Sequence, residues 1–139
     1  MSVHFQQELP ILCNVDVVVV GAGPAGLGAA IAAARSGAKT LVLDAAGCIG
    51  GMATSGGVGP FMTSFDSQGN NMVIRGIFQE LVDRMEALGG AIQPGKTRNG
   101  DSYASYLRLG HNNVGPFKSD ILKLVGTRML QEACLLYTS

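Results

Sequence analysis

The 139-residue sequence has little charge and no excess of either sign. Charged residues make up 14% of the chain, where about 25% is usual for soluble domains, and the 10 basic residues balance the 10 acidic ones. A surface that binds nucleic acid needs a basic excess or a basic stripe, so we expect no nucleic-acid partner. The chain is 47% hydrophobic, which excludes intrinsic disorder, because disordered chains combine low hydrophobicity with high net charge.

The sequence also lacks the patterns of secreted, membrane and metal-binding proteins. Its first ten residues have no basic start followed by an apolar run, so they do not predict a signal peptide. The most apolar stretch, residues 15–34, is interrupted by an aspartate, four glycines and a proline, so it does not predict a membrane span. The three cysteines form no CxxC pair and have no histidine at ligand spacing. We therefore expect a cytoplasmic protein with no membrane contact and no metal site.

The first third of the chain is predicted to form a strand, a helix and a second strand. Residues 17–20 are a run of valines that ends at a glycine, which is typical of a strand buried on both faces of a parallel sheet. Residues 24–36 are rich in alanine and end at Gly37, a signal for the end of a helix. Residues 40–44 predict the second strand. This order predicts a right-handed βαβ unit, and so a Rossmann-like α/β domain whose parallel sheet is incomplete within the chain.

Two amphipathic helices are predicted further along the chain. Apolar residues at three-and-four spacing predict one helix over residues 73–88 and another over residues 119–133, with Ser119 as the N-cap of the second. The polar stretch between them, residues 91–116, predicts at most one short strand, around its tyrosines. Two strands are too few for the sheet of a βαβ unit, so a third is expected directly after the last helix.

The turn between the first strand and the first helix has the pattern GxGxxG. In such turns the first glycine permits the tight bend, the second lets a pyrophosphate approach the backbone, and the third lets helix and strand pack closely. The helix N-terminus offers N–H groups and a positive dipole end to phosphates. Asp44 follows about twenty residues later, where a carboxylate accepts hydrogen bonds from a ribose. The pattern predicts dinucleotide binding, and a turn without a ligand is the alternative.

A second glycine cluster, residues 47–54, follows Asp44 and Ala45. The Gly50-Gly51 pair in it can pass beneath the pyrophosphate or the ribityl chain of a longer cofactor, which favours FAD over NAD. Thr54 follows the pair and is expected near the isoalloxazine ring. A flexible loop without a ligand is the alternative. The candidate cofactor-binding residues are thus Gly21, Ala22, Gly23, Pro24, Ala25, Gly26, Asp44, Ala45, Gly50, Gly51, Met52 and Thr54.

Residues 16–26, 49–56 and 58–61, together with the two later helices, resemble the N-terminal part of the FAD-dependent oxidoreductase family with a glutathione-reductase-type FAD domain. The resemblance covers most of residues 15–133. Family members are much longer and carry a separate substrate domain. The resemblance therefore implies that residues 15–133 are the N-terminal part of an FAD-binding domain, that residues 1–14 are an extension, and that the substrate domain is missing. The family more often has glutamate where Asp44 stands.

The resemblance also implies a function. FAD would take a hydride from a small organic substrate that the sequence does not identify, and the chain by itself is expected to be inactive. No catalytic residue can be named, because acids and bases would usually come from the missing substrate domain. Two alternatives stay open: a flavoprotein of the tRNA-modification type, and a non-catalytic nucleotide-binding fragment. The sequence does not indicate an oligomeric state.

The last six residues, 134–139, fit poorly with the helix before them. They read as the translation of TGT-CTC-TTA-TAC-ACA-TCT, which resembles a transposon-end adaptor used in sequencing libraries. We expect this segment to derive from such an adaptor and the gene to continue after Ala133. A genuine apolar tail is the alternative.

Overall fold

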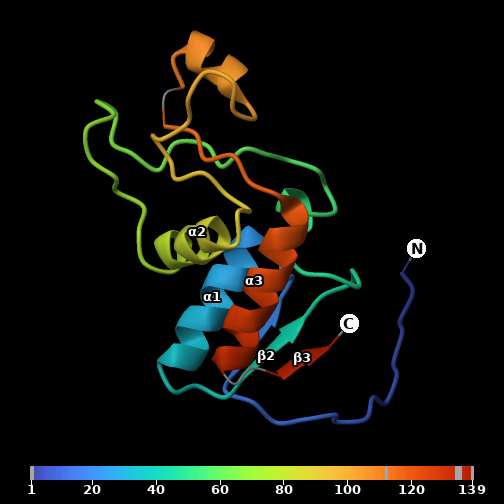
Figure 1. Ribbon diagram of the computed structural model, residues 1–139. Helices are drawn as coiled ribbons and strands as arrows, with labels where there is room; N and C mark the ends of the chain where they lie inside the picture. The colour runs from blue at the N-terminus through green and yellow to red at the C-terminus, as the bar shows by residue number, and fades with distance from the viewer. Residues whose placement is uncertain (1, 112, 134–135, 139) are drawn as a thin grey trace.

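The computed structural model describes residues 2–111, 113–133 and 136–138 of the chain. Figure 1 shows helices packed in front of a small sheet, with a long extended segment before the first strand. The elements follow in the order β1 (Val17–Val20), α1 (Pro24–Arg35), β2 (Thr40–Leu43), the short 3-10 helix η1 (Gly51–Ala53), α2 (Ile77–Ala87), the 3-10 helix η2 (Ala104–Leu109), α3 (Ser119–Glu132) and β3 (Leu136–Thr138).

The sheet is parallel and has the order β1-β2-β3. Val17 lies opposite Thr40 on β2, and the register continues to Val20 opposite Leu43. This confirms the βαβ unit, because α1 connects the two strands. β3 lies on the other side of β2, directly after α3 and within the last six residues, so it does not test the third strand that is expected in the continuation of the gene. The adaptor origin of residues 134–139 stays a prediction, and residues 134, 135 and 139 lie outside the described part of the chain.

The core lies between α1, the sheet and the two later helices. α1 packs against β1 and β2, and both α2 and α3 pack against α1. The fully buried side chains come from all of these layers and include Ile31, Val42, Met85 and Met129. Every helix among the described residues is too short or too polar to span a bilayer.

The prediction that β1 is buried on both faces is wrong. Val18 is 51% exposed and Val20 is 81% exposed, while Val17 and Val19 are half-buried on the side of α1. The reason is that α1, α2 and α3 all lie on one side of the sheet in Figure 1. A run of valines predicts a strand, but it does not indicate whether one face or both faces of that strand are covered.

Two helix starts also differ from prediction. α2 begins at Ile77, after Gly76 with φ of 65°, because the amides of Val73 and Ile74 both donate to the Ser64 carbonyl instead of entering a helix. Lys118, in extended conformation, is the N-cap of α3, and Ser119 is its first helical residue. The stretch around the tyrosines is the 3-10 helix η2, so the short strand predicted there is wrong.

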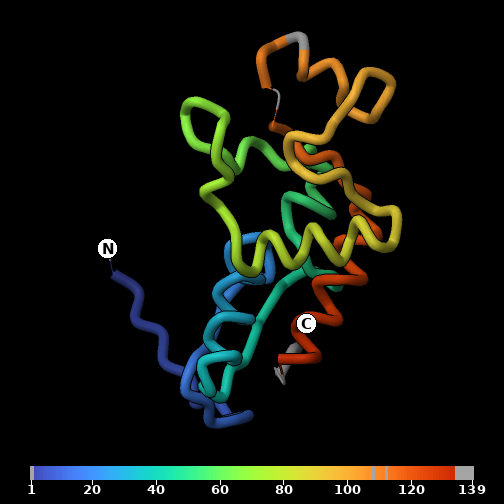
Figure 2. The backbone as a smooth tube through the Cα atoms, turned by 60° about the vertical axis from the view of Figure 1, so that its left-hand side comes forward, coloured from blue at the N-terminus to red at the C-terminus, as the bar shows by residue number. Residues whose placement is uncertain are grey.

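The loops on either side of α2 form a lobe. Figure 2 shows that the loop before α2 and the loop after it lie side by side, at the opposite end of the molecule from the turn between α1 and β2. Isolated antiparallel bridges tie the lobe together, between Phe61 and Gly115, Phe65 and Met72, and Ala91 and Phe117. The Phe61 ring stacks on Phe117 with centroids 4.1 Å apart.

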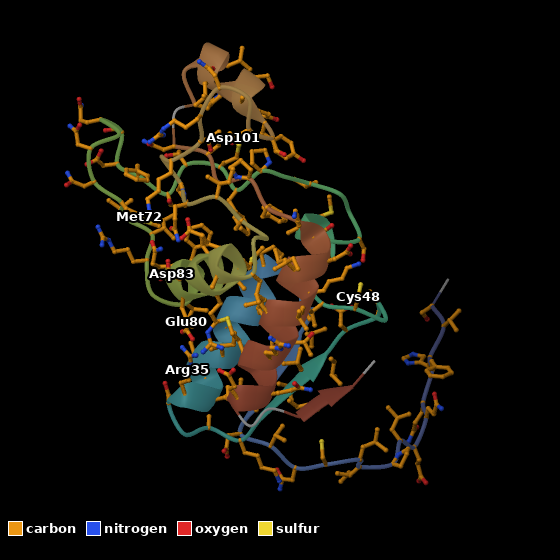
Figure 3. The ribbon with its side chains drawn as sticks, viewed as in Figure 1. Arg35, Cys48, Met72, Glu80, Asp83 and Asp101 are labelled. Carbon is orange, nitrogen blue, oxygen red and sulfur yellow. The ribbon has the colours of Figure 1, made fainter. Side chains whose placement is uncertain are left out.

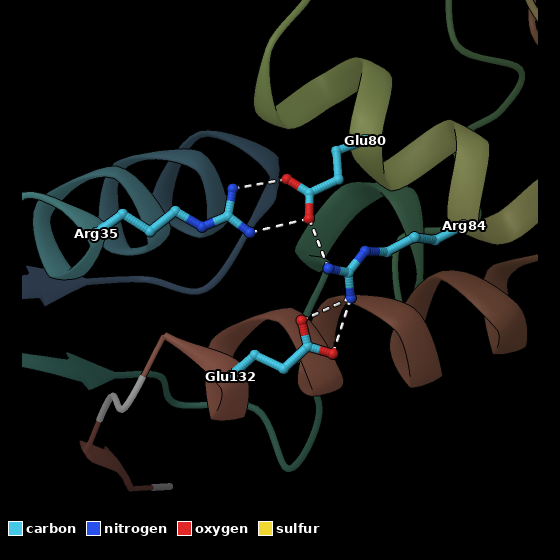
Figure 4. A network of polar contacts seen from close by, with 4 residues as sticks. All are labelled: Arg35, Glu80, Arg84 and Glu132. Atoms are coloured by element: carbon cyan, nitrogen blue, oxygen red, sulfur yellow. Dashed lines mark hydrogen bonds and ion pairs between the residues drawn. The ribbon is translucent and has the colours of Figure 1, made fainter.

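A chain of four charged side chains joins the three helices (Figure 4). The guanidinium of Arg35 on α1 donates to both carboxylate oxygens of Glu80 on α2, at 2.6 and 2.9 Å. Arg84 contacts Glu80 at 2.7 Å and Glu132 on α3 at 2.7 Å. Arg35 and Glu80 are also labelled in Figure 3. Bidentate geometry and a shared network are the conditions under which surface ion pairs stabilise a fold.

Replacing Glu80 with glutamine is expected to lower the free energy of unfolding at neutral pH by about 1 kcal/mol, since exposed ion pairs contribute about 0.2–1 kcal/mol each. The hydrogen bonds from Arg35 hold the pKa of Glu80 below its ordinary value. A carboxylate with a depressed folded pKa stabilises the fold above its unfolded pKa, and this contribution is lost as the pH falls through the folded pKa. In urea unfolding, the difference between wild type and Glu80→Gln should therefore shrink as the pH falls below about 4.

Asp120→Asn is the matched control for this measurement. Asp120 is 93% exposed and lies 3.8 Å from Lys123, so its loss should change stability by at most a few tenths of a kcal/mol, roughly the value of a helix dipole contact. A pH-independent effect of Glu80→Gln would contradict an ionic role for the network.

Candidate dinucleotide-binding site

The glycine turn leaves the sheet at Gly21. The Gly21 amide donates to the Leu43 carbonyl at 2.7 Å, which continues the hydrogen bonding between β1 and β2 by one residue. Gly21 then has φ of 96°, in the left-handed region where side chains are disfavoured and glycine is not. The bend that the first glycine of the pattern predicts is thus present.

Gly26 allows α1 to sit directly on this turn. A Cβ built on Gly26 would lie 1.8 Å from the Gly21 carbonyl oxygen and 3.4 Å from a methyl group of Val19. No side chain fits in that space. The close contact of helix and strand predicted for the third glycine is therefore a property of the fold.

The N-terminus of α1 is open and carries no competing side chain. Gly23 is the N-cap, with an extended backbone and no side-chain hydrogen bond, and the first turn holds no acidic residue. Pro24 occupies the first helical position and has no N–H, while the amides of Ala25 and Gly26 have no acceptor within the helix. A Cβ on Gly23 would meet nothing within 4 Å, so there is free space for a phosphate against the backbone. These residues fit a bound pyrophosphate.

The second glycine cluster contacts the first. The Gly50 amide donates to the Ala22 carbonyl at 2.8 Å, and a Cβ on Gly51 would lie 3.0 Å from the Gly23 Cα. Gly50 and Gly51 have φ of 99° and 48°, so the loop turns sharply over the GxGxxG segment, residues 21–26, which we call the fingerprint. The structure thus brings together the two clusters that the sequence proposes for one cofactor.

Other side chains of this cluster, among them those of the predicted site residues Met52 and Thr54, lie apart from this contact. Met52 is 62% exposed. Thr54 is buried, and its hydroxyl donates to the Ile49 carbonyl at 2.7 Å, so it closes its own loop. Cys48, labelled in Figure 3, lies on the loop after β2 with its sulfur 3.1 Å from the Ser55 hydroxyl.

Asp44 stands at the end of β2, beside the fingerprint. Its Oδ2 accepts a hydrogen bond from the Ala22 amide, and its Oδ1 accepts one from the Ala46 amide at 2.7 Å. These bonds, the one from Ala22 first, hold the pKa of Asp44 below its ordinary value. An open groove beside Asp44 is lined by Leu12, Val20, Gly21, Leu43, Ala45 and Ala46. Asp44 and Ala45 are thus both accessible from this groove.

Sequence reasoning missed an apolar pocket of about 300 Å³ next to the fingerprint. Pro24 and Gly50 line it together with apolar residues of all three helices and of the lobe, Leu27, Gly28, Phe61, Ile77, Phe78, Leu81 and Leu122. One signal was available in the sequence, because Gly28 is a glycine inside an alanine-rich helix. In the structure, a Cβ at Gly28 would meet nothing within 4 Å. Among the described residues, no group of three or more histidine, cysteine, aspartate or glutamate side chains could hold a metal ion.

Comparisons with known proteins place this site in a family. The family model for FAD dependent oxidoreductases matches residues 16–138. A thiamine thiazole synthase of Aeropyrum pernix is 40% identical over 83 residues, which are 60% of this chain and 27% of that protein. The sarcosine oxidase alpha subunit of a Corynebacterium species is 68% identical over 31 residues, which are 22% of this chain and 3% of that protein. The matches thus span about a quarter of these relatives or less.

A solved structure shows the same fold. CabE, an aromatic hydroxylase from angucycline biosynthesis, matches with a TM-score of 0.51 and 19% identity over 90% of this chain and 23% of that one. This likeness supports the Rossmann-type architecture alone. The family match, which covers most of the chain and includes both glycine clusters, identifies it further: the chain belongs to the FAD-dependent oxidoreductase family, and its cofactor is FAD.

Proposed function

We propose that this chain is the FAD-binding part of a flavin-dependent oxidoreductase that takes a hydride from a small organic substrate. The observation that carries the proposal is the open N-terminus of α1, which two mutually contacting glycine clusters surround. Neither cluster needs this geometry for folding alone, since a capped helix start would be more stable than an open one.

Each part of the site has a separate task in binding. The free amides of Ala25 and Gly26 would hold the pyrophosphate, and Gly23 leaves the space for it. Asp44 faces the groove in which an adenosine ribose would lie. The loop at Gly50 and Gly51 would border the other half of the cofactor. When bound, FAD supplies the redox chemistry by accepting the hydride, and the chain supplies binding and orientation.

The described residues include no group that we assign as a catalytic acid or base. Thr54 and Cys48 are engaged within their own loop. We therefore expect the chain to bind FAD without turning over a substrate. The described residues add no observation in favour of a tRNA-modification role.

Titration of the 139-residue chain with FAD tests the proposal. We expect quenching of flavin fluorescence with one site per chain, and a rise in stability of about 2.7 kcal/mol when FAD is present at 100 times its Kd. FMN, which lacks the AMP half of FAD, should bind more weakly, because it cannot reach the groove at Asp44. Absence of saturable FAD binding by a folded chain would refute this function and favour the non-catalytic alternative.

The hydride step is tested on the protein encoded by the whole gene. Anaerobic addition of the correct organic substrate should bleach the visible absorbance of the flavin, and a substrate deuterated at the donor carbon should bleach it more slowly. Absence of flavin bleaching by the substrate under these anaerobic conditions would contradict hydride transfer to FAD.

A further inference from the structure

We infer that Asp44 is a positioning residue for the pyrophosphate site, because its carboxylate fixes the Ala22 peptide from which the glycine turn starts. This inference rests on the proposed FAD-binding function and adds to the ribose contact predicted for Asp44. The expected ribose contact alone does not require Asp44 to touch the fingerprint. In the structure it does.

The Ala22 peptide is held on both sides. Ala22 has no exposed surface; its N–H donates to Asp44 and its carbonyl accepts from the Gly50 amide. The preceding amide, of Gly21, donates to Leu43. Contacts from β2 and from the loop after it therefore fix the backbone of residues 21–22, which leads directly into Gly23 and the open end of α1.

Asp44 is suited to this role because it is itself held in place. The Ala46 amide binds Oδ1 at 2.7 Å, while Ala22 binds Oδ2. An ionised carboxylate accepts hydrogen bonds only, and its two oxygens have about four lone-pair sites. Both amides are satisfied by half of this capacity, and the other half is left for ribose hydroxyls. One side chain can thus hold the turn and contact the ribose together.

Asparagine in place of Asp44 would keep one acceptor oxygen for the two amides of Ala22 and Ala46, and its NH2 group would face the other amide. The two amides could then no longer both be satisfied in the present arrangement. A buried donor that loses its partner is costly, so the turn would move to reach another acceptor or water. The amides at the start of α1 would then no longer be pre-arranged around a phosphate, and pre-arrangement contributes directly to affinity. The loss of affinity should therefore also appear for a nucleotide that has a pyrophosphate and no ribose hydroxyls.

Two nucleotides separate this role from ribose binding. ADP has the pyrophosphate and the ribose hydroxyls, while 2′,3′-dideoxy-ADP has the pyrophosphate without those hydroxyls. We expect Asp44→Asn to weaken binding of 2′,3′-dideoxy-ADP by a factor of about ten, which corresponds to about 1.4 kcal/mol. Binding of ADP should weaken by at least as much, because ADP also loses its ribose contact with Asp44. If Asp44→Asn weakened only ADP, Asp44 would act through the ribose alone and the inference would be overturned.

Asp16→Asn is the matched control. Asp16 precedes β1 and its carboxylate accepts a backbone hydrogen bond from Lys39 at 2.8 Å, so it is the same kind of contact at the opposite end of the two strands. Its removal should leave the affinity for both nucleotides within a factor of two of wild type. An equal loss in both variants would mean that Asp44 acts on general stability, which would also overturn the inference.

Amide hydrogen exchange of the wild-type chain, measured by NMR, tests the inference even if the Asp44→Asn variant does not fold or the wild type does not bind nucleotide. In the wild-type chain the Ala22 amide should exchange as slowly as amides in the centre of β2. Exchange as fast as that of exposed loops would show that the Asp44 contact is absent in solution. If wild type binds no nucleotide and yet protects the Ala22 amide, the proposed function fails, while the contact that positions the turn stands.

Discussion

Replacing Gly26 with alanine is expected to abolish FAD binding and to destabilise the chain by about 4 kcal/mol or more, the range reached when a core position is severely overpacked. The added methyl group would overlap the Gly21 carbonyl oxygen at 1.8 Å. That oxygen belongs to backbone that is held by β2 and cannot turn aside as a side chain could. α1 would have to move off the sheet, and its open N-terminus would leave the turn.

Gly28→Ala is the control for this substitution, in the same helix and two residues away. A Cβ there would meet nothing within 4 Å, so the change should raise stability by about 0.5–1 kcal/mol through helix propensity alone. Urea unfolding and FAD titration measure both variants. A Gly26→Ala chain with the unfolding midpoint and affinity of wild type would show that the close contact of α1 with the turn is wrong.

Replacing Met129 with alanine is expected to cost about 2–5 kcal/mol, the usual range for removing a large buried side chain. Met129 has no exposed surface and belongs to the core cluster that joins α3 to α1 and the sheet. Its loss leaves a cavity that the surrounding helices can close only in part. The unfolding midpoint in urea should fall strongly with an unchanged slope.

Leu124→Ala on the same helix provides the comparison. Leu124 is 42% exposed, so its truncation should cost less than about 1 kcal/mol, in line with the smaller apolar area that it buries. Similar losses for the two variants would mean that α3 does not face the core through Met129.

Those parts of the fold that depend on neighbours in sequence could be predicted. The valine run, the glycine turn and the alanine-rich segment specify β1, the bend and α1 by local preference, and the structure has all three. The contact between the two glycine clusters was suggested by their shared fit to one long cofactor, and the Gly50 bond to Ala22 shows it.

Parts that depend on tertiary contacts could not be predicted. The exposed face of Val18 and Val20 follows from where the helices lie, and the sequence of β1 contains no information on that. The late start of α2 follows from the Ser64 carbonyl, which takes two amides that a helix would otherwise use. Asp44 was predicted to face a ribose, and its bond to Ala22 required knowledge of how the turn lies against the end of β2.

The fingerprint, Asp44 and the Gly50-Gly51 pair together form the nucleotide cradle, and all of them lie within a short stretch of chain. Ala22 and Asp44 are 22 positions apart, and the bond from Gly50 to Ala22 closes the same loop. Structures dominated by contacts between nearby residues form quickly, and during synthesis the N-terminal parts of a protein fold first. Every residue of this cradle lies within residues 21–51, but α1 is held in place by a core that includes side chains of α2 and α3. We therefore expect a nascent chain to bind flavin only after those two helices have been made.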